Sequence, residues 1–175
     1  VFIILLVLGL AACQTTTPIE SATTQLKQPV VKPMKNYSIQ GVDVSKYQGD
    51  VDFFRLKKSG IHYVFIRATE GITYQDVDYL SNYAKASAAG LKVGVYHFYE
   101  TNDDPLSQLS NFISLVTLNT GDLAPVIDIE KLHQNDDKNL IYDLRLFLDG
   151  LEAHYGVKPI VYTGENFANQ YLTDF

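Results

Sequence analysis

Apolar and amphipathic segments alternate along the chain from residue 37 to residue 175. The apolar runs are six to eight residues long, a typical strand length. They predict strands over 38–45, 62–69, 92–99, 124–130 and 158–163. The segments between and after them predict helices over 52–59, 76–89, 105–118, 138–155 and 164–172. This regular alternation predicts an α/β fold with a parallel sheet covered by helices.

Glycine follows three of the predicted helices. Gly60, Gly90 and Gly156 occupy these positions, and glycine tolerates the left-handed backbone that often ends a helix. The strands are mostly continuous apolar runs, as expected for a sheet buried on both faces. Two architectures fit this pattern, an open doubly wound sheet and a barrel. No glycine-rich phosphate-binding motif follows any run, so a nucleotide site has no support.

Acidic residues occur where the predicted strands end. Asp43 lies near the end of the first run, Glu70 follows the second, and Asp128 and Glu130 end the fourth. In barrel enzymes the chemistry lies at the carboxyl ends of the strands. The acids are therefore candidates for one shared site.

Asp128 and Glu130 form the most informative pattern. Alternate residues of a strand face the same way, with Cα atoms about 6.5–7 Å apart. Two neighbouring carboxylates repel each other, so one pKa tends to rise. A protonated acid beside an ionised one is what glycosidic cleavage requires. The same tripeptide also fits a pair of solvated acids or two ligands of a divalent metal ion.

Asp43 and His97 interrupt apolar runs. A charged residue inside an apolar strand is costly unless it is paired or functional. Asp43 is thus either a structural hydrogen-bonding residue or a third acid of the same site, and His97 is predicted to be a hydrogen-bonded core residue. Tyr96 and Tyr162 lie at strand ends, where tyrosine rings can stack on sugars. The chain lacks a Gly-x-Ser-x-Gly motif, which argues against acyl transfer by a serine nucleophile.

Residues 1–12 are an unbroken run of apolar residues and glycine. The run is shorter than the ~20 residues of a membrane-spanning helix and suits the core of a secretion signal. Its end, Leu10-Ala11-Ala12-Cys13, resembles the lipobox of bacterial lipoproteins. That resemblance implies cleavage before Cys13 and a lipid on its thiol, so residues 1–12 are expected to be part of a signal peptide. An ordinary cleaved signal and an apolar strand with an incidental cysteine are the alternatives.

Residues 13–36 are expected to be a tether, because they are rich in Thr, Gln, Pro and Lys and contain no aromatic residue. We therefore expect an exported protein that is anchored to a bacterial membrane through Cys13. In a Gram-negative source this would be the outer membrane, because residue 14 is Gln and not Asp. Residues 37–175 are expected to form the folded domain.

Charge and cysteine content exclude several partners. The 175 residues carry a formal net charge of −6 and contain no basic block, so nucleic acid is not an expected partner. A single cysteine excludes an intrachain disulfide framework and a cysteine-based metal cluster.

Five motifs resemble, in order, those of glycoside hydrolase family 25, the Chalaropsis-type lysozymes. They are Gly41-Val42-Asp43-Val44-Ser45-Lys46-Tyr47-Gln48-Gly49, Phe65-Ile66-Arg67-Ala68-Thr69-Glu70-Gly71, Gly94-Val95-Tyr96-His97-Phe98, Pro125-Val126-Ile127-Asp128-Ile129-Glu130 and Pro159-Ile160-Val161-Tyr162-Thr163-Gly164. The family often has Trp where this chain has Tyr47. The resemblance spans about residues 39–175.

The resemblance implies an irregular, TIM-like (β/α)5β3 barrel over residues 37–175. It implies an enzyme without cofactor or metal, a lysozyme that cleaves the β-1,4 bond between N-acetylmuramic acid and N-acetylglucosamine in peptidoglycan. By position, Glu130 would be the proton donor, Asp128 the second catalytic carboxylate and Asp43 an acid on the floor of the site. The implied substrate-lining residues are Glu70, Tyr96 and Tyr162.

The family domain continues with further short strands, so the chain is expected to be truncated at its C-terminus. Three other functions stay open beside a lipid-anchored muramidase that acts on peptidoglycan strands. They are a glycosidase acting on another N-acetylhexosamine polymer such as chitin, a non-enzymatic cell-wall-binding lipoprotein, and a metal-dependent hydrolase.

Overall fold

The computed structural model describes residues 38–133, 139–173 and 175. The predicted signal peptide, the tether and Cys13 lie outside these residues. In chain order the elements are β1 (Gly41–Val44), the 3-10 helix η1 (Lys46–Gln48), α1 (Phe53–Lys58), β2 (Tyr63–Glu70), β3 (Tyr74–Gln75), α2 (Tyr79–Ala88), β4 (Lys92–Phe98), α3 (Pro105–Leu115), β5 (Val126–Asp128), α4 (Leu140–Tyr155), β6 (Ile160–Tyr162) and α5 (Glu165–Tyr171).

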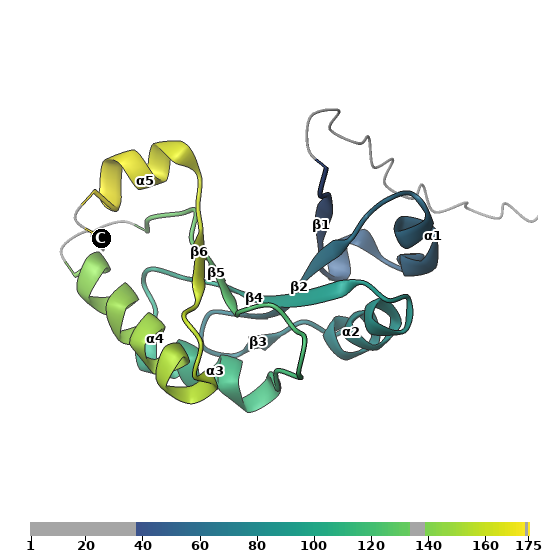
Figure 1. Cartoon of the computed structure of the whole chain (residues 1–175). Helices are drawn as coiled ribbons and strands as arrows, with labels where there is room; N and C mark the ends of the chain where they lie inside the picture. Colours follow the sequence, from purple (N-terminus) through teal and green to yellow (C-terminus); the bar gives the residue numbers. More distant parts are fainter. Residues whose placement is uncertain (1–37, 134–138, 174) are drawn as a thin grey trace, which may run out of the picture.

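The sheet has the strand order β1-β2-β4-β5-β6, with every neighbouring pair parallel. The strands thus follow one another in chain order, without the reversal that defines a doubly wound sheet. Winding in a single direction is the arrangement of a barrel wall. Figure 1 shows the sheet curving into a trough, with β1 and β6 rising on its two sides and α2, α3 and α4 along its outer surface. The α/β prediction is confirmed, and of the two open architectures the barrel-like one is present.

Each of the ten predicted segments contains an element of the predicted type, and all of these elements except β2 are shorter than predicted. β5 ends at Asp128, so Glu130 lies beyond the strand and not at its end. Two short elements, β3 and η1, were not predicted from the sequence. β3 pairs antiparallel with the end of β2, and η1 begins with a capping box in which the Ser45 side chain accepts from Tyr47 N. Elements of two or three residues are too short to show a periodicity.

Gly60, Gly90 and Gly156 do follow helices, with φ of 91°, 73° and 70°. An L-residue adopts this left-handed backbone only with strain, whereas glycine has no Cβ to clash. The prediction that glycine ends these helices is confirmed.

The main core lies between the sheet and the outer helices. Its fully buried side chains include Phe53, Val64, Ile66, Ala86, Val95, Phe112, Ile127, Leu144, Phe147 and Leu151. His97 belongs to this layer, as predicted. Its Nδ1 lies 2.7 Å from Thr69 Oγ1 and its Nε2 lies 3.0 Å from Gln108 Oε1, and burial lowers the pKa of the imidazole to about 4.

Phe147 of α4 stacks on the His97 ring with a centroid distance of 5.0 Å and meets the Tyr99 ring at 5.3 Å. It therefore fastens α4 to the sheet. We expect Phe147→Ala to lower the free energy of unfolding by about 3–5 kcal/mol, because a buried ring leaves a cavity. Phe54→Ala is the matched control, since this ring is 57% exposed and its loss is expected to cost about 0.5 kcal/mol or less. Urea unfolding followed by circular dichroism measures both, and equal losses would contradict this account of the core.

Candidate active site

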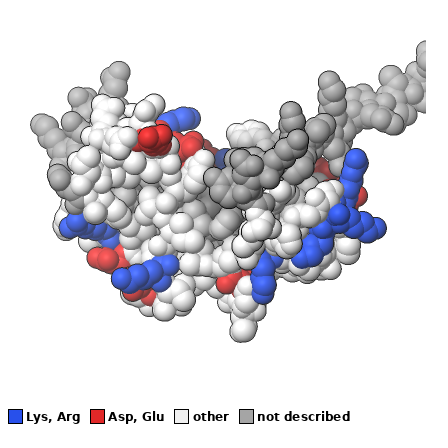
Figure 2. Space-filling model, turned by 45° about the horizontal axis from the view of Figure 1, so that its top comes forward, with Lys and Arg blue, Asp and Glu red and all other residues white. Residues whose placement is uncertain are grey.

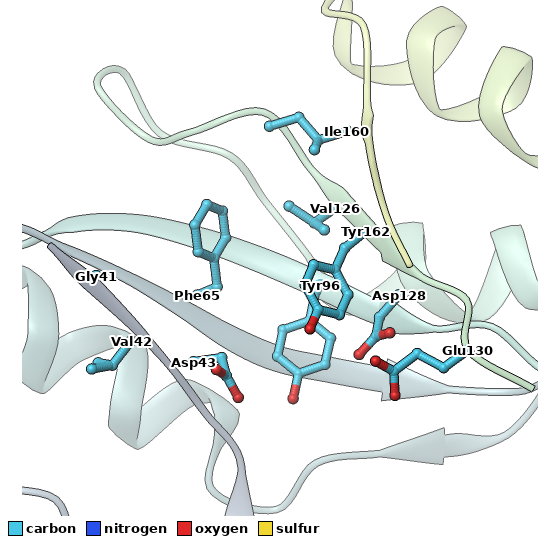
Figure 3. A pocket seen from close by; sticks show the side chains of 10 residues that line it. All are labelled: Gly41, Val42, Asp43, Phe65, Tyr96, Val126, Asp128, Glu130, Ile160 and Tyr162. Atoms are coloured by element: carbon cyan, nitrogen blue, oxygen red, sulfur yellow. The ribbon is translucent and has the colours of Figure 1, made fainter. Parts of the chain in front are cut away.

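A pocket of about 510 Å³ opens on the concave face of the sheet. Every parallel strand contributes to its lining (Figure 3). The lining residues are Gly41, Val42, Asp43, Phe65, Tyr96, Val126, Asp128, Glu130, Ile160 and Tyr162. The pocket and the main core therefore lie on opposite faces of one sheet.

Strand alternation explains why the pocket has an apolar part and a polar part. Residues two apart on a strand share a face, and β5 and β6 each place an apolar residue before a polar one on the pocket side. Val126 is in register with Ile160, and Asp128 with Tyr162. The polar members stand nearer the carboxyl ends of the strands, which is where barrel enzymes place their chemistry.

Glu130 reaches the pocket although it lies beyond β5. The backbone after the strand stays tied to both neighbours, because Tyr99 N donates to Asp128 O at 2.8 Å and Ile129 N donates to Tyr162 O at 3.0 Å. Ile129 is fully buried in the core, so the next residue turns back to the pocket side. Figure 3 shows the Asp128 and Glu130 carboxylates pointing into the same part of the pocket. The prediction that these two side chains point to the same side is confirmed.

The two carboxylates differ in their surroundings. Asp128 is partly buried, and its Oδ1 is buried without a hydrogen-bond partner among the described residues. Glu130 is exposed at the mouth. Burial, and then the negative charges of Glu130 and Asp43, raise the pKa of Asp128 to about 7, while Arg67 opposes the rise. The sequence predicted that one pKa of the pair would rise, and the structure assigns the rise to Asp128.

Asp43 lies on β1, an edge strand of the described sheet, and its side chain is exposed within the pocket. Of the two alternatives left open for Asp43, its place beside Asp128 and Glu130 favours the third acid. Tyr96 and Tyr162 also line the pocket. Burial raises the pKa of the Tyr96 phenol, and the charge of Glu130 raises that of Tyr162.

Glu70 does not line the pocket. Its Oε2 accepts from Arg67 Nη1 at 2.8 Å, and its side chain is one-third exposed. The structure therefore places Glu70 outside the pocket lining, as the partner of Arg67.

Arg67 is the residue that the sequence reasoning missed. It lies two residues after Phe65 on β2, and so on the pocket side, and it is buried. A signal was present in the sequence, because Arg67 is a charged residue inside an apolar run. The same criterion had selected Asp43.

Among residues 38–133 and 139–173, no group of three or more His, Cys, Asp or Glu side chains is placed to hold a metal ion. In the same part of the chain, none of the helices has the length and apolar character needed to cross a bilayer.

Solved structures similar to this chain include a family 25 glycosyl hydrolase and a bacterial lysozyme. A family 25 glycosyl hydrolase from Bacillus anthracis superposes with a TM-score of 0.75 at 34% identity, covering 82% of this chain and 69% of that one. A bacterial lysozyme from Streptomyces coelicolor gives a TM-score of 0.70 at 26% identity, covering 77% of this chain and 66% of that one.

Curated relatives include an autolytic lysozyme from Clostridium acetobutylicum, 37% identical over 129 residues, which are 74% of this chain and 39% of the relative. An N,O-diacetylmuramidase from Arthroderma benhamiae is 30% identical, over 74% of this chain and 59% of that protein. The chain thus spans between about two-fifths and three-fifths of the length of these relatives.

The family model for glycosyl hydrolases family 25 matches residues 42–175. This segment contains β1 apart from its first residue, the four other parallel strands, and all the acids that line the pocket. The chain belongs to glycosyl hydrolases family 25.

Proposed function

We propose that the domain is a muramidase, which hydrolyses the β-1,4 bond between N-acetylmuramic acid and N-acetylglucosamine in peptidoglycan. The observation that carries the proposal is the Asp128–Glu130 pair in a half-open pocket, with a carboxyl whose pKa is about 7. Relatives named lysozyme and N,O-diacetylmuramidase support the choice of substrate.

Glu130 is the proton donor in this proposal, because it lines the pocket with an exposed carboxyl, which is accessible to a glycan that enters from solvent. As the glycosidic C–O bond breaks, the proton passes to the leaving oxygen and positive charge develops at the anomeric carbon. Asp128, when ionised, stabilises that charge. Water then adds to the anomeric carbon and gives up a proton to the Glu130 carboxylate, which restores the acid. Asp43 supplies a further negative charge in the pocket.

Asp128 holds the working proton before the reaction. Because burial and the neighbouring negative charges raise its pKa to about 7, this carboxyl keeps its proton up to neutral pH. Transfer of that proton from Asp128 to Glu130 then leaves the first ionised and the second ready to donate.

We expect Glu130→Gln to lower the rate of peptidoglycan hydrolysis by about 10²–10⁴-fold, the usual worth of general acid catalysis. Gln keeps the size of the side chain but has no proton to transfer. Glu152→Gln is the matched control, since Glu152 is exposed on α4, and it should retain the full rate. Release of reducing muramic acid ends from purified peptidoglycan, followed by mass spectrometry, measures the reaction.

Retention of more than about a tenth of the rate by folded Glu130→Gln would exclude Glu130 as the general acid. A parallel assay with chitin tests the alternative substrate. If chitin is cleaved faster than peptidoglycan, chitin becomes the proposed substrate.

The pH dependence tests the shared proton. A carboxyl with a pKa raised from 3.8 to about 7 keeps its proton until the pH passes 7, so kcat/KM should fall as the pH rises through this value. We expect Asp128→Asn to remove this limb, because the amide does not titrate, and to lower the rate because a neutral group stabilises positive charge poorly. An unchanged limb near pH 7 in Asp128→Asn would assign it to another group.

We further propose that Cys13 carries a lipid and that the enzyme faces the cell wall from a bacterial membrane. The support is the lipobox-like Leu10-Ala11-Ala12-Cys13 after an apolar run. We expect Cys13→Ala to abolish incorporation of labelled fatty acid in a bacterial host and to release the protein from the membrane fraction or leave it unprocessed. Ser21→Ala, within the proposed tether, is the control. Labelled fatty acid on the Cys13→Ala protein would refute the anchor.

A further inference from the structure

A buried arginine stands beside the acidic pocket. Arg67 is 6% exposed and forms two ion pairs. Its Nε donates to Asp76 Oδ2 at 3.1 Å, and its Nη1 donates to Glu70 Oε2 at 2.8 Å. Its third nitrogen, Nη2, is buried and has no hydrogen-bond partner among the described residues.

Two tyrosine rings hold the guanidinium in place. Its central carbon lies 4.9 Å from the centroid of the Tyr47 ring and 5.1 Å from that of Tyr74. Asp76, which also accepts from the backbone of Lys46 at 3.1 Å, ties this cluster to η1. A guanidinium with two ion pairs and two ring contacts has little freedom to move, so its charge has a defined position.

An irregularity in β2 separates this charge from the main core. The register between β2 and β4 shifts between Arg67 and Thr69. Thr69 therefore bonds His97 on the core side, while Arg67, in register with Tyr96, stays on the pocket side. Bulges of this kind often re-aim side chains at active sites.

The charged and phenolic groups around the Asp128 carboxyl come from four parallel strands, β1, β2, β4 and β6, and from the segment after β5. They are Asp43, Arg67, Tyr96, Glu130 and Tyr162. The phenols stay neutral at the pH of interest. The two other carboxylates favour a protonated Asp128, whereas Arg67 favours the ionised form.

We propose that Arg67 is a positioning residue that acts through Asp128. Its fixed guanidinium offsets part of the repulsion among the three pocket carboxylates, and so sets the pH above which Asp128 loses its proton. As far as it concerns catalysis, this inference rests on the proposed muramidase activity.

Arg67→Met tests the proposal, because it keeps a long apolar stem and removes the charge. We expect the pKa of Asp128 to rise by about one unit, the low end of the effect of a nearby opposite charge. The basic limb of kcat/KM should move with it to higher pH. Arg67→Lys retains a positive charge, so the Asp128 pKa in this variant should stay close to its value in the unchanged protein.

The matched control is Arg55→Met. Arg55 is exposed in the last turn of α1, together with Lys57 and Lys58. In Figure 2 blue side chains gather at the right-hand end of the molecule, where Figure 1 places this helix. The control should leave both the limb and the carboxyl titration unchanged.

Titration of ¹³C-labelled carboxyl groups by NMR gives the Asp128 pKa without any turnover. It separates the two proposals, because a chain that does not cleave peptidoglycan can still show the effect of Arg67. A folded Arg67→Met protein that loses activity equally at every pH, with the Asp128 pKa unmoved, would reduce Arg67 to a structural role and overturn the inference.

Glu70→Gln is the second variant, for the case in which Arg67→Met does not fold. It removes one of the two negative partners of Arg67 at a side chain that is one-third exposed. The guanidinium, which then keeps only Asp76 as a negative partner, should lower the Asp128 pKa, the opposite direction to Arg67→Met. An unchanged or raised pKa in Glu70→Gln would also overturn the proposal.

Discussion

Repulsion among three carboxylates in one half-open pocket is the constraint on which the rest of this site depends. Asp43, Asp128 and Glu130 face the same space, and Asp128 is partly withdrawn from water. Three negative charges so close together raise the free energy of the folded protein, so one of the carboxyls keeps its proton up to neutral pH. The same repulsion that makes the pocket costly to fold supplies a transferable proton for glycosidic cleavage.

The fold accommodates this electrostatic repulsion because one face of the sheet forms the apolar core and the other face forms the acidic pocket. Apolar side chains and the hydrogen-bonded His97 pack between the sheet and its outer helices, where stability is generated. The concave face bears the acids and the cluster around Arg67. The sheet is curved (Figure 1), and the curvature brings residues of β1, β5 and β6 into one pocket.

Much of this arrangement follows from local pattern. Apolar runs and helical spacing indicated the order of strands and helices, because each depends on neighbours a few residues apart. Asp128 and Glu130 were identified as a pair by their spacing, and Asp43 by its charge within an apolar run. Five of the six residues proposed for catalysis or substrate binding do line the pocket; Glu70 instead pairs with Arg67.

The sequence by itself determined the alternation of elements and the residue types at the strand ends. Only the tertiary structure decided that Asp128 has a raised pKa, because its burial is set by the surrounding strands. The role of Arg67 likewise depends on contacts with Tyr47 and Asp76 and on an irregularity in β2. Sequence periodicity does not predict such contacts. They join segments that are distant in the sequence and come together only when the sheet and its loops pack.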